Sequence, residues 1–401
     1  MIKIKNFYSE EEIKRYYKFL RSREPKKKSG KKYILDKKIE EVGNEIVELL
    51  NKLPRNNTEE ISDFKELVTM SFIKLREFHS SLQTEDSSYR LLYNDESNQE
   101  LLNLYKSYYT RFFTSNDGKF KNNISLIKDL GITVCPYCNR NYINSRHDKL
   151  GCEFDHYYNK DDFPFFALTL SNLVPSCSTC NRIKGTDYYE FFPFDIRGDT
   201  EVKFIVYPPS QNSKIEILFE KKLQAEIITQ SYEKPETATV KVTTKWEKKN
   251  NQDGKQTDKI NLLLYKTIDS LTTKVLEQEV TKDHCEYEFT HLPKYDSGKE
   301  IFYSVYEESQ VYDILELKSA YEIHTKDVAE MFDREQKYCK EYREDLIKFL
   351  SDKGNAGIDV SEKNFDSMIF GEIANDGFDN YLTEPLSKLK KVTYDYIVEL
   401  R

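Results

Sequence analysis

The chain has 401 residues and a formal net charge of -8, and 38% of its residues are hydrophobic. This length allows two or three structural units with their own cores, and the apolar content excludes a wholly disordered chain. The acidic balance argues against indiscriminate binding of nucleic acid, which depends on Lys and Arg to neutralise phosphates. It still allows one local basic cleft.

Residues 1–130 are predicted to form a helical N-terminal region. Apolar residues recur near a 3.6-residue period in four stretches, residues 36–53, 62–82, 98–113 and 122–132. Ser62 and Asp63 are the expected cap residues of the second stretch, and Gly131 is the expected end of the last. The basic segment 21–32 favours a solvated loop over a grip on DNA.

Residues 131–198 differ in composition from the preceding region, because they are rich in Cys, Pro, Asn and aromatic residues and contain no long amphipathic period. This composition is typical of a small unit that a metal ion holds together. We expect it to form the centre of the chain, between two regions that are mainly helical.

Residues 199–401 are predicted to mix a β-hairpin region with helices. Alternating residues predict strands at 202–210, 214–221 and 238–246, with a hairpin turn following at 250–256. Helices are expected to return at residues 257–280, 315–350 and 384–400. The predicted fold class is α+β, a mainly helical chain with a central zinc-stapled unit and a small β-hairpin region.

The first 17 residues lack the apolar core of a secretory signal, and no apolar stretch approaches the length of a membrane span. We therefore expect a cytoplasmic protein without a membrane partner.

Two Cys-x-x-Cys pairs bracket the central region, and their members are Cys135, Cys138, Cys177 and Cys180. Two thiolates on a tight turn can share one tetrahedral ion, and a second pair completes its coordination. In a chain without an export signal, this spacing favours thiolates held by metal over disulfides. We predict a structural Zn²⁺ held by all four, with two pairs of buried apolar cysteines as the alternative. Cys152 is expected to serve packing.

Between and just after these pairs stand Asp155-His156, Asn172 and Asn181. This arrangement resembles the HNH endonucleases, whose ββα-metal core is often clamped by two Cys-x-x-Cys knuckles. In that family an Asp-His pair is followed by an Asn about sixteen residues later, and then by a His or Asn directly after a cysteine pair. Here Asn181 takes the place of the third His. The amino-acid sequence of residues 134–195 most resembles the HNH proteins of Septu-type and retron-associated antiphage systems, which are paired with an ABC-class ATPase.

The resemblance implies a role for each of these residues. His156 would be the general base, and a neutral imidazole suits that task. Asp155 and Asn181 would hold one catalytic Mg²⁺ or Mn²⁺ through oxygen. Asn172 would brace the loop and orient His156. Lys160 and Lys184 stand where phosphate contacts are expected.

The resemblance therefore implies a metal-dependent HNH endonuclease, with DNA as the favoured target and tRNA or other RNA as the second. Its expected role is that of a toxic effector in antiphage defence, dependent on an ABC-type ATPase partner. One alternative is a zinc-stapled binding or scaffold subunit with a vestigial nuclease site. Another is a stand-alone restriction or repair nuclease. A neighbouring ATPase gene would favour the defence role, and a methyltransferase gene would favour restriction.

Overall fold

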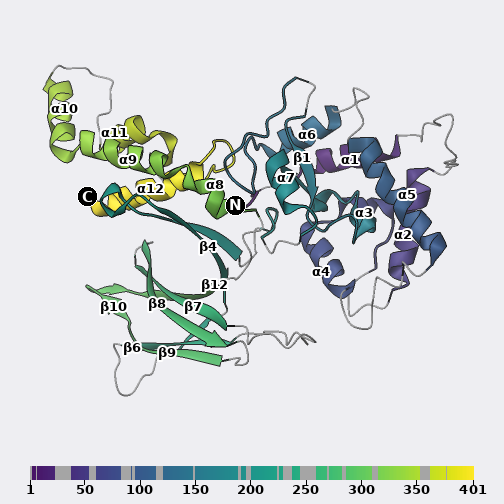
Figure 1. The fold of residues 1–401 in the computed structure, drawn as a ribbon, viewed down its shortest axis with the longest axis horizontal. Helices are drawn as coiled ribbons and strands as arrows, with labels where there is room; N and C mark the ends of the chain where they lie inside the picture. The colour runs from purple at the N-terminus through teal and green to yellow at the C-terminus, as the bar shows by residue number, and fades with distance from the viewer. Residues whose placement is uncertain are drawn as a thin grey trace. The chain divides into compact units, whose positions relative to one another are not determined.

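The structure is a computed structural model, and Figure 1 shows its ribbon. It describes residues 2–5, 7–22, 38–53, 60–82, 92, 95–113, 121–147, 150–187, 191–195, 200–223, 225–228, 237–243, 259–268, 271–281, 286–308, 315–352, 362–375 and 377–401. The chain divides into two compact units: residues 1–196, 314–317 and 330–401 form the first, and residues 197–313 and 318–329 form the second. Most of the basic segment 21–32 and the hairpin turn predicted at 250–256 lie outside the described residues.

The first unit begins with a run of helices, as predicted. Their bounds are Glu10–Arg21 for α1, Ile39–Asn51 for α2, Phe64–Thr69 for α3, Phe72–Leu82 for α4, Glu96–Phe113 for α5 and Lys121–Leu130 for α6. Asp63 caps α3 as expected, because its side chain accepts a hydrogen bond from the Glu66 amide. Gly131 follows α6 with a φ of 66°, a conformation that glycine adopts without strain.

The single helix predicted for residues 62–82 is wrong, because the chain breaks between α3 and α4. Met70 has an extended backbone, with φ -58° and ψ 147°, and its side chain is buried. The apolar period therefore continues across two short helices, and burial of Met70 overrides the local preference for one helix.

A β-hairpin followed by a helix stands between the N-terminal helices and the second unit in the sequence. Strand β1 (Glu153–His156) pairs antiparallel with β2 (Leu173–Ser176), and α7 (Ser178–Lys184) follows. Because side chains alternate along a strand, Asp155 and His156 leave β1 on opposite faces. Short 3₁₀ turns at Pro164–Phe166 and Leu170–Asn172 lie in the connection between the strands.

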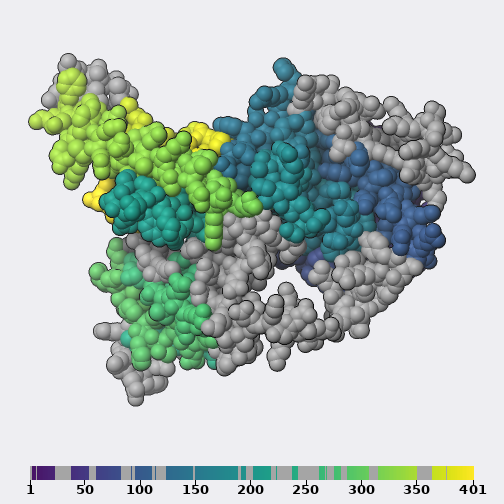
Figure 2. Space-filling model, in the orientation of Figure 1, coloured from purple at the N-terminus to yellow at the C-terminus, as the bar shows by residue number. Residues whose placement is uncertain are grey.

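The N-terminal helices hold this hairpin through hydrogen bonds to its backbone and its connecting loop. The Tyr109 hydroxyl on α5 donates to the Phe154 carbonyl at 2.8 Å, and the Tyr16 hydroxyl on α1 donates to the Leu168 carbonyl at 2.7 Å. In return, the Thr169 hydroxyl donates to the Leu67 carbonyl on α3 at 2.9 Å. In the space-filling view, blue and teal residues of this unit adjoin without a break (Figure 2).

A C-terminal segment also belongs to the first unit and binds residues that flank the first cysteine pair. Asn139, with φ 52° and a fully buried side chain, donates to the Tyr381 carbonyl at 2.6 Å and accepts from the Lys388 amide at 3.1 Å. The Leu386 amide donates to the Asn139 carbonyl, and the amides of residues 133 and 134 donate to the Leu382 carbonyl. Sequence positions about 250 residues apart are thereby joined.

The C-terminal helices are Leu317–Glu322 for α8, Thr325–Lys337 for α9, Lys340–Asp352 for α10, Glu362–Phe370 for α11 and Ser387–Leu400 for α12. They confirm the helices predicted within residues 315–350 and 384–400. No helix among the described residues is long and apolar enough to cross a membrane.

The second unit is built from two antiparallel sheets. Its strands are Thr200–Val206 for β3, Ile215–Lys222 for β4, Ala225–Ile228 for β5, Thr237–Thr243 for β6, Lys259–Ile268 for β7, Leu271–Thr281 for β8, Glu286–Pro293 for β9 and Phe302–Glu308 for β12. Within the described residues, one sheet has the order β3-β4-β12-β7-β8 and the other has the order β5-β6-β9. A small ribbon pairs β10 (Tyr295–Asp296) with β11 (Lys299–Glu300). The strands predicted around β3, β4 and β6 are confirmed.

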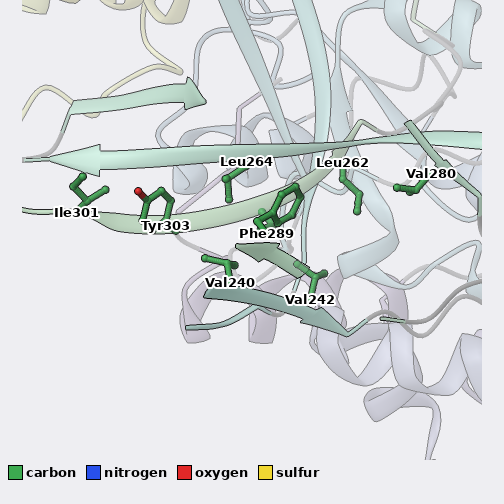
Figure 3. Close-up of a cluster of buried hydrophobic side chains, with 9 residues drawn as sticks. Val240, Val242, Leu262, Leu264, Val280, Phe289, Ile301 and Tyr303 are labelled. Carbon is green, nitrogen blue, oxygen red and sulfur yellow. The ribbon is translucent and has the colours of Figure 1, made fainter. Parts of the chain in front are cut away.

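The two sheets share one apolar core. Figure 3 shows Val240 and Val242 of β6 and Phe289 of β9 beside Leu262 and Leu264 of β7. This face-to-face packing defines a β-sandwich, which is larger than the small β-hairpin region that the sequence predicted.

The helix predicted for residues 257–280 is wrong, because this segment forms strands β7 and β8. Leu262 and Leu264 point into the sandwich core, while Leu263 and Tyr265 belong to a second buried cluster with Tyr306. Strand β7 pairs with β12 on one side and β8 on the other. Both of its faces are therefore apolar, and such a run has no alternation that separates a strand from a helix.

Candidate functional site

The four cysteines of the two pairs converge in the first unit. All four are buried, and their Sγ atoms lie within 4.8 Å of one another, so the group can hold a metal ion. The Cys177 amide donates to Cys135 Sγ at 3.3 Å, and the Asn141 side-chain amide donates to Cys177 Sγ at 3.3 Å. A donor set of four thiols with stabilising N–H groups has the chemistry of a structural zinc site. The convergence predicted from the spacing is confirmed.

Cys152 is buried outside this group, as expected for a packing residue. Burial raises the pKa of its thiol, so the thiol stays protonated and unreactive.

Asp155 faces α7 and is almost fully buried. Tyr137, which lies between the first two cysteines, donates its hydroxyl to Asp155 Oδ2 at 2.6 Å. Lys184 at the end of α7 approaches both carboxylate oxygens, at 3.2 Å from Oδ1 and 3.1 Å from Oδ2, and also donates to the His156 carbonyl at 2.9 Å. Burial raises the pKa of Asp155, and Lys184 and Tyr137 oppose that effect. The carboxylate is thus satisfied by protein groups.

His156 faces α5, on the opposite side of β1 from Asp155. Its ring meets Tyr109 edge to face, with 4.3 Å between the ring centroids, and its Nε2 lies 3.1 Å from the Ala167 carbonyl oxygen. A carbonyl can only accept, so Nε2 carries the proton and Nδ1 carries the lone pair. Burial lowers the pKa of His156 to about 3, with a further contribution from the positive charge of Lys160. The imidazole is therefore neutral at physiological pH.

Asn172 is fully buried and closes the loop that carries the Ala167 carbonyl. Its Oδ1 accepts from the Tyr158 amide at 2.8 Å, and its Nδ2 donates to the carbonyls of Tyr158 and Phe166 at 3.0 and 3.2 Å. These bonds fix the loop between residues 158 and 166, and the Phe166 carbonyl is adjacent in sequence to Ala167. Asn172 therefore restrains the group that orients His156.

Replacing Asn172 with alanine is expected to lower the free energy of unfolding by about 2–4 kcal/mol, because three buried backbone groups lose their partner. Chemical denaturation followed by circular dichroism measures the loss. Asn159→Ala is the matched control, since Asn159 bonds to Asp162 in a surface turn. Equal losses in the two variants would show that Asn172 does not hold the loop.

Asn181 lies on the first turns of α7 and is half-buried. Its Nδ2 donates to Glu153 Oε2 at 2.6 Å, and Glu153 is on the same face of β1 as Asp155. Lys160 is half-buried in the turn after β1, and its charge lowers the pKa values of both His156 and Asp155. Lys184 is 1% exposed, so its ammonium is directed at Asp155 and away from solvent.

The sequence analysis missed the partners of the predicted site residues. Tyr137 holds Asp155, Glu153 holds Asn181, and Tyr109 packs against His156. No spacing rule predicts the aromatic partners. The burial of Lys184 has a sequence signal, because Lys184 lies four residues after Cys180 and therefore on the same face of the helix.

His79 on α4 stacks on Tyr158 beside the braced loop, with 3.7 Å between ring centroids. Burial lowers the pKa of His79 to about 4. Above about pH 6.5 the His79 ring is neutral in the folded and the unfolded protein. Below that pH the unfolded chain binds a proton at His79, whereas the folded chain binds it only near pH 4. Stability is therefore lost as the pH falls through this window.

We expect His79 to account for about 2 kcal/mol of the stability lost between pH 7 and pH 5. His79→Phe keeps a stacking ring without the proton. Denaturation curves at the two pH values compare the variant with the wild type, and an unchanged pH dependence in the variant would contradict the prediction.

A family model described as the Cna protein B-type domain matches residues 240–326. A collagen adhesin of Staphylococcus aureus is 38% identical over 82 residues, which make up 20% of this chain and 7% of the adhesin. The chain thus spans a small part of the length of that relative. No solved structure gives a significant match. The match to the family model covers strands β6 to β12 and α8, so this part of the β-sandwich unit is similar to a Cna B-type domain.

Proposed function

We propose that the first unit is a metal-dependent endonuclease of the HNH type, which hydrolyses phosphodiester bonds in nucleic acid. The observation that carries this proposal is the orientation of His156 by the Ala167 carbonyl, on a loop closed by Asn172. The hairpin, the helix and the four-cysteine group around it are the elements that an HNH core would require.

The state of His156 supports a role as general base. Its Nε2 is engaged with a carbonyl, so Nδ1 has the lone pair that can take a proton from water. Because burial lowers the pKa of His156 to about 3, this lone pair persists at physiological pH, but it is a weaker base than that of an ordinary histidine. Lys160 lies close enough to lower the pKa of His156, and it is partly exposed and so accessible for a phosphate contact.

Asp155 and Asn181 provide oxygen donors of the kind that Mg²⁺ or Mn²⁺ prefers. When bound, such a cation would stabilise negative charge on the phosphate oxygens. Lys184 and Tyr137 engage both oxygens of Asp155 in this structure, so cation binding there requires displacement of the ammonium.

The proposed target is DNA, with tRNA or other RNA as the second candidate, and the proposed setting is antiphage defence with an ABC-type ATPase partner. The net charge of -8 supports dependence on a partner for substrate capture. Reduced cysteines that bind metal suit the cytoplasm.

Purified wild type and His156→Ala test the nuclease proposal against plasmid DNA and total tRNA, in Mg²⁺, Mn²⁺ or EDTA. We expect metal-dependent cutting by wild type and a loss of at least about 100-fold in the variant, in keeping with general-base catalysis. His291→Ala is the control, since His291 is exposed in the second unit. Equal cutting by His156→Ala would exclude His156 as the base.

A second candidate is a zinc-stapled binding or scaffold subunit. The Lys184–Asp155 pair favours it, because the pair satisfies the carboxylate without a cation. The match of residues 240–326 to an adhesin domain also favours a binding module in the second unit. This candidate predicts that Asp155 and His156 are dispensable in cells, while the four cysteines are required.

A further inference from the structure

We propose that the four-cysteine group sets the orientation of Asp155, with Tyr137 as the positioning residue that couples metal binding to the carboxylate. The consequence for catalysis rests on the proposed nuclease function. The coupling itself rests on contacts that hold whether or not the protein cuts nucleic acid.

The turn of the first cysteine pair contains one hydrogen-bond donor to Asp155, the Tyr137 hydroxyl. The Asn139 amide donates to the Cys135 carbonyl at 2.8 Å, which closes the turn that contains Tyr137. The Tyr137 ring is fully buried, so the turn determines where its hydroxyl points. That hydroxyl donates to Asp155 Oδ2 at 2.6 Å, and a bond to a charged acceptor is among the stronger hydrogen bonds in proteins.

The helix that begins at the second cysteine pair carries the other donor, the Lys184 ammonium. Cys177 caps α7, Cys180 lies in its first turn, and Lys184 ends it with an ammonium 3.2 Å from Asp155 Oδ1. Each cysteine pair thus carries one group that binds Asp155. A metal ion that brings the four thiols together therefore also brings the Tyr137 hydroxyl and the Lys184 ammonium to the same carboxylate.

This arrangement makes a reciprocal prediction, because coupling between two sites acts equally in both directions. Weakening the Tyr137–Asp155 bond should loosen the cysteine group. In the zinc-loaded protein, the rate of zinc transfer to a chromophoric chelator measures this effect.

A double-mutant cycle of Tyr137→Phe and Asp155→Asn provides the test. Each single variant is expected to release zinc about tenfold faster than wild type. Tyr137→Phe should add clearly less than a further tenfold when Asp155→Asn is already present, because that substitution has replaced the charge-assisted bond by a weaker bond to a neutral oxygen. Tyr16→Phe is the matched control: it removes a buried hydroxyl that donates to a backbone carbonyl at 2.7 Å and should leave the release rate unchanged. Multiplicative effects in the double variant, or equal rates for Tyr137→Phe and Tyr16→Phe, would overturn the proposal.

Two further measurements keep the test decisive. If Tyr137→Phe does not fold, Asp155→Asn alone must release zinc faster than a Lys160→Gln control. In nuclease assays, zinc-loaded Tyr137→Phe should lower kcat without changing KM for the nucleic acid. If the two substitutions are coupled in their effect on zinc release but the protein cuts no nucleic acid, the nuclease proposal is wrong and the coupling proposal stands. If they are uncoupled in a protein that does cut nucleic acid, the coupling proposal is wrong and the nuclease proposal stands.

Discussion

Cys177→Ser is expected to abolish stoichiometric metal binding and to lower the melting temperature of the first unit by roughly 10–20 °C. Serine is a poor ligand for zinc, and Cys177 is at the centre of the thiol group: its Sγ accepts from Asn141 and from the Cys180 amide, and its own amide donates to Cys135. Because all four thiols are buried together, loss of the metal leaves α7 without its attachment to the first cysteine pair. Elemental analysis and calorimetry measure the two effects.

The control for this prediction is Cys339→Ser, because Cys339 is exposed between α9 and α10 and lies outside the thiol group. It should retain the metal and the wild-type melting temperature. A wild-type protein that binds no zinc, and a Cys177→Ser variant with unchanged melting, would show that the four cysteines form a packed cluster and do not bind metal. That was the alternative left open by the sequence.

The sequence predicts the thiol group well because metal coordination depends on local spacing. A Cys-x-x-Cys turn fixes its two sulfurs before any tertiary contact forms, and two such turns have few ways to combine. The N-terminal helices were predictable for a similar reason, since the apolar period of α2 and α5 marks one buried face. Only the break at Met70 depends on how the two short helices pack.

The β-sandwich could not be derived from periodicity, because β7 is buried on both faces. Leu262, Leu263 and Leu264 form a continuous apolar run, which a helical period fits as well as a strand does. A usable signal was present in the β-branched residues that follow, Thr267, Ile268, Thr272, Thr273 and Val275. Their density favours strands over the predicted helix.

The sequence analysis named residues that the structure places on and around β1 and α7, but it did not predict how they pair. The resemblance and its positive charge placed Lys184 at a phosphate, which requires an exposed ammonium. The structure buries it against Asp155, a residue that was predicted to bind a cation. Asp155 cannot pair with the Lys184 ammonium and hold a catalytic cation through the same oxygens. Whether a cation can displace Lys184 therefore distinguishes the two proposed functions.

Lys184→Met should therefore lower the free energy of unfolding by about 3–5 kcal/mol, because it leaves a buried carboxylate without its counter-ion. The double variant Asp155→Asn/Lys184→Met should recover most of this loss, since it removes both charges and lets Tyr137 still donate to the side-chain oxygen. Chemical denaturation compares the variants. Lys160→Met, at a half-buried position, is the control and should change stability by no more than about 0.5 kcal/mol.

Adding Mn²⁺ to these variants distinguishes a latent cation site from a structural ion pair. If Asp155 can bind a cation, Mn²⁺ should raise the melting temperature of Lys184→Met more than that of wild type, because the competing ammonium is gone and binding to the folded state stabilises it. The double variant should not respond, since it lacks the carboxylate. If Lys184→Met does not respond either, Asp155 serves only as the counter-ion of Lys184. The first unit would then be a zinc-stapled scaffold, and His156 would have no catalytic cation at Asp155 to act beside.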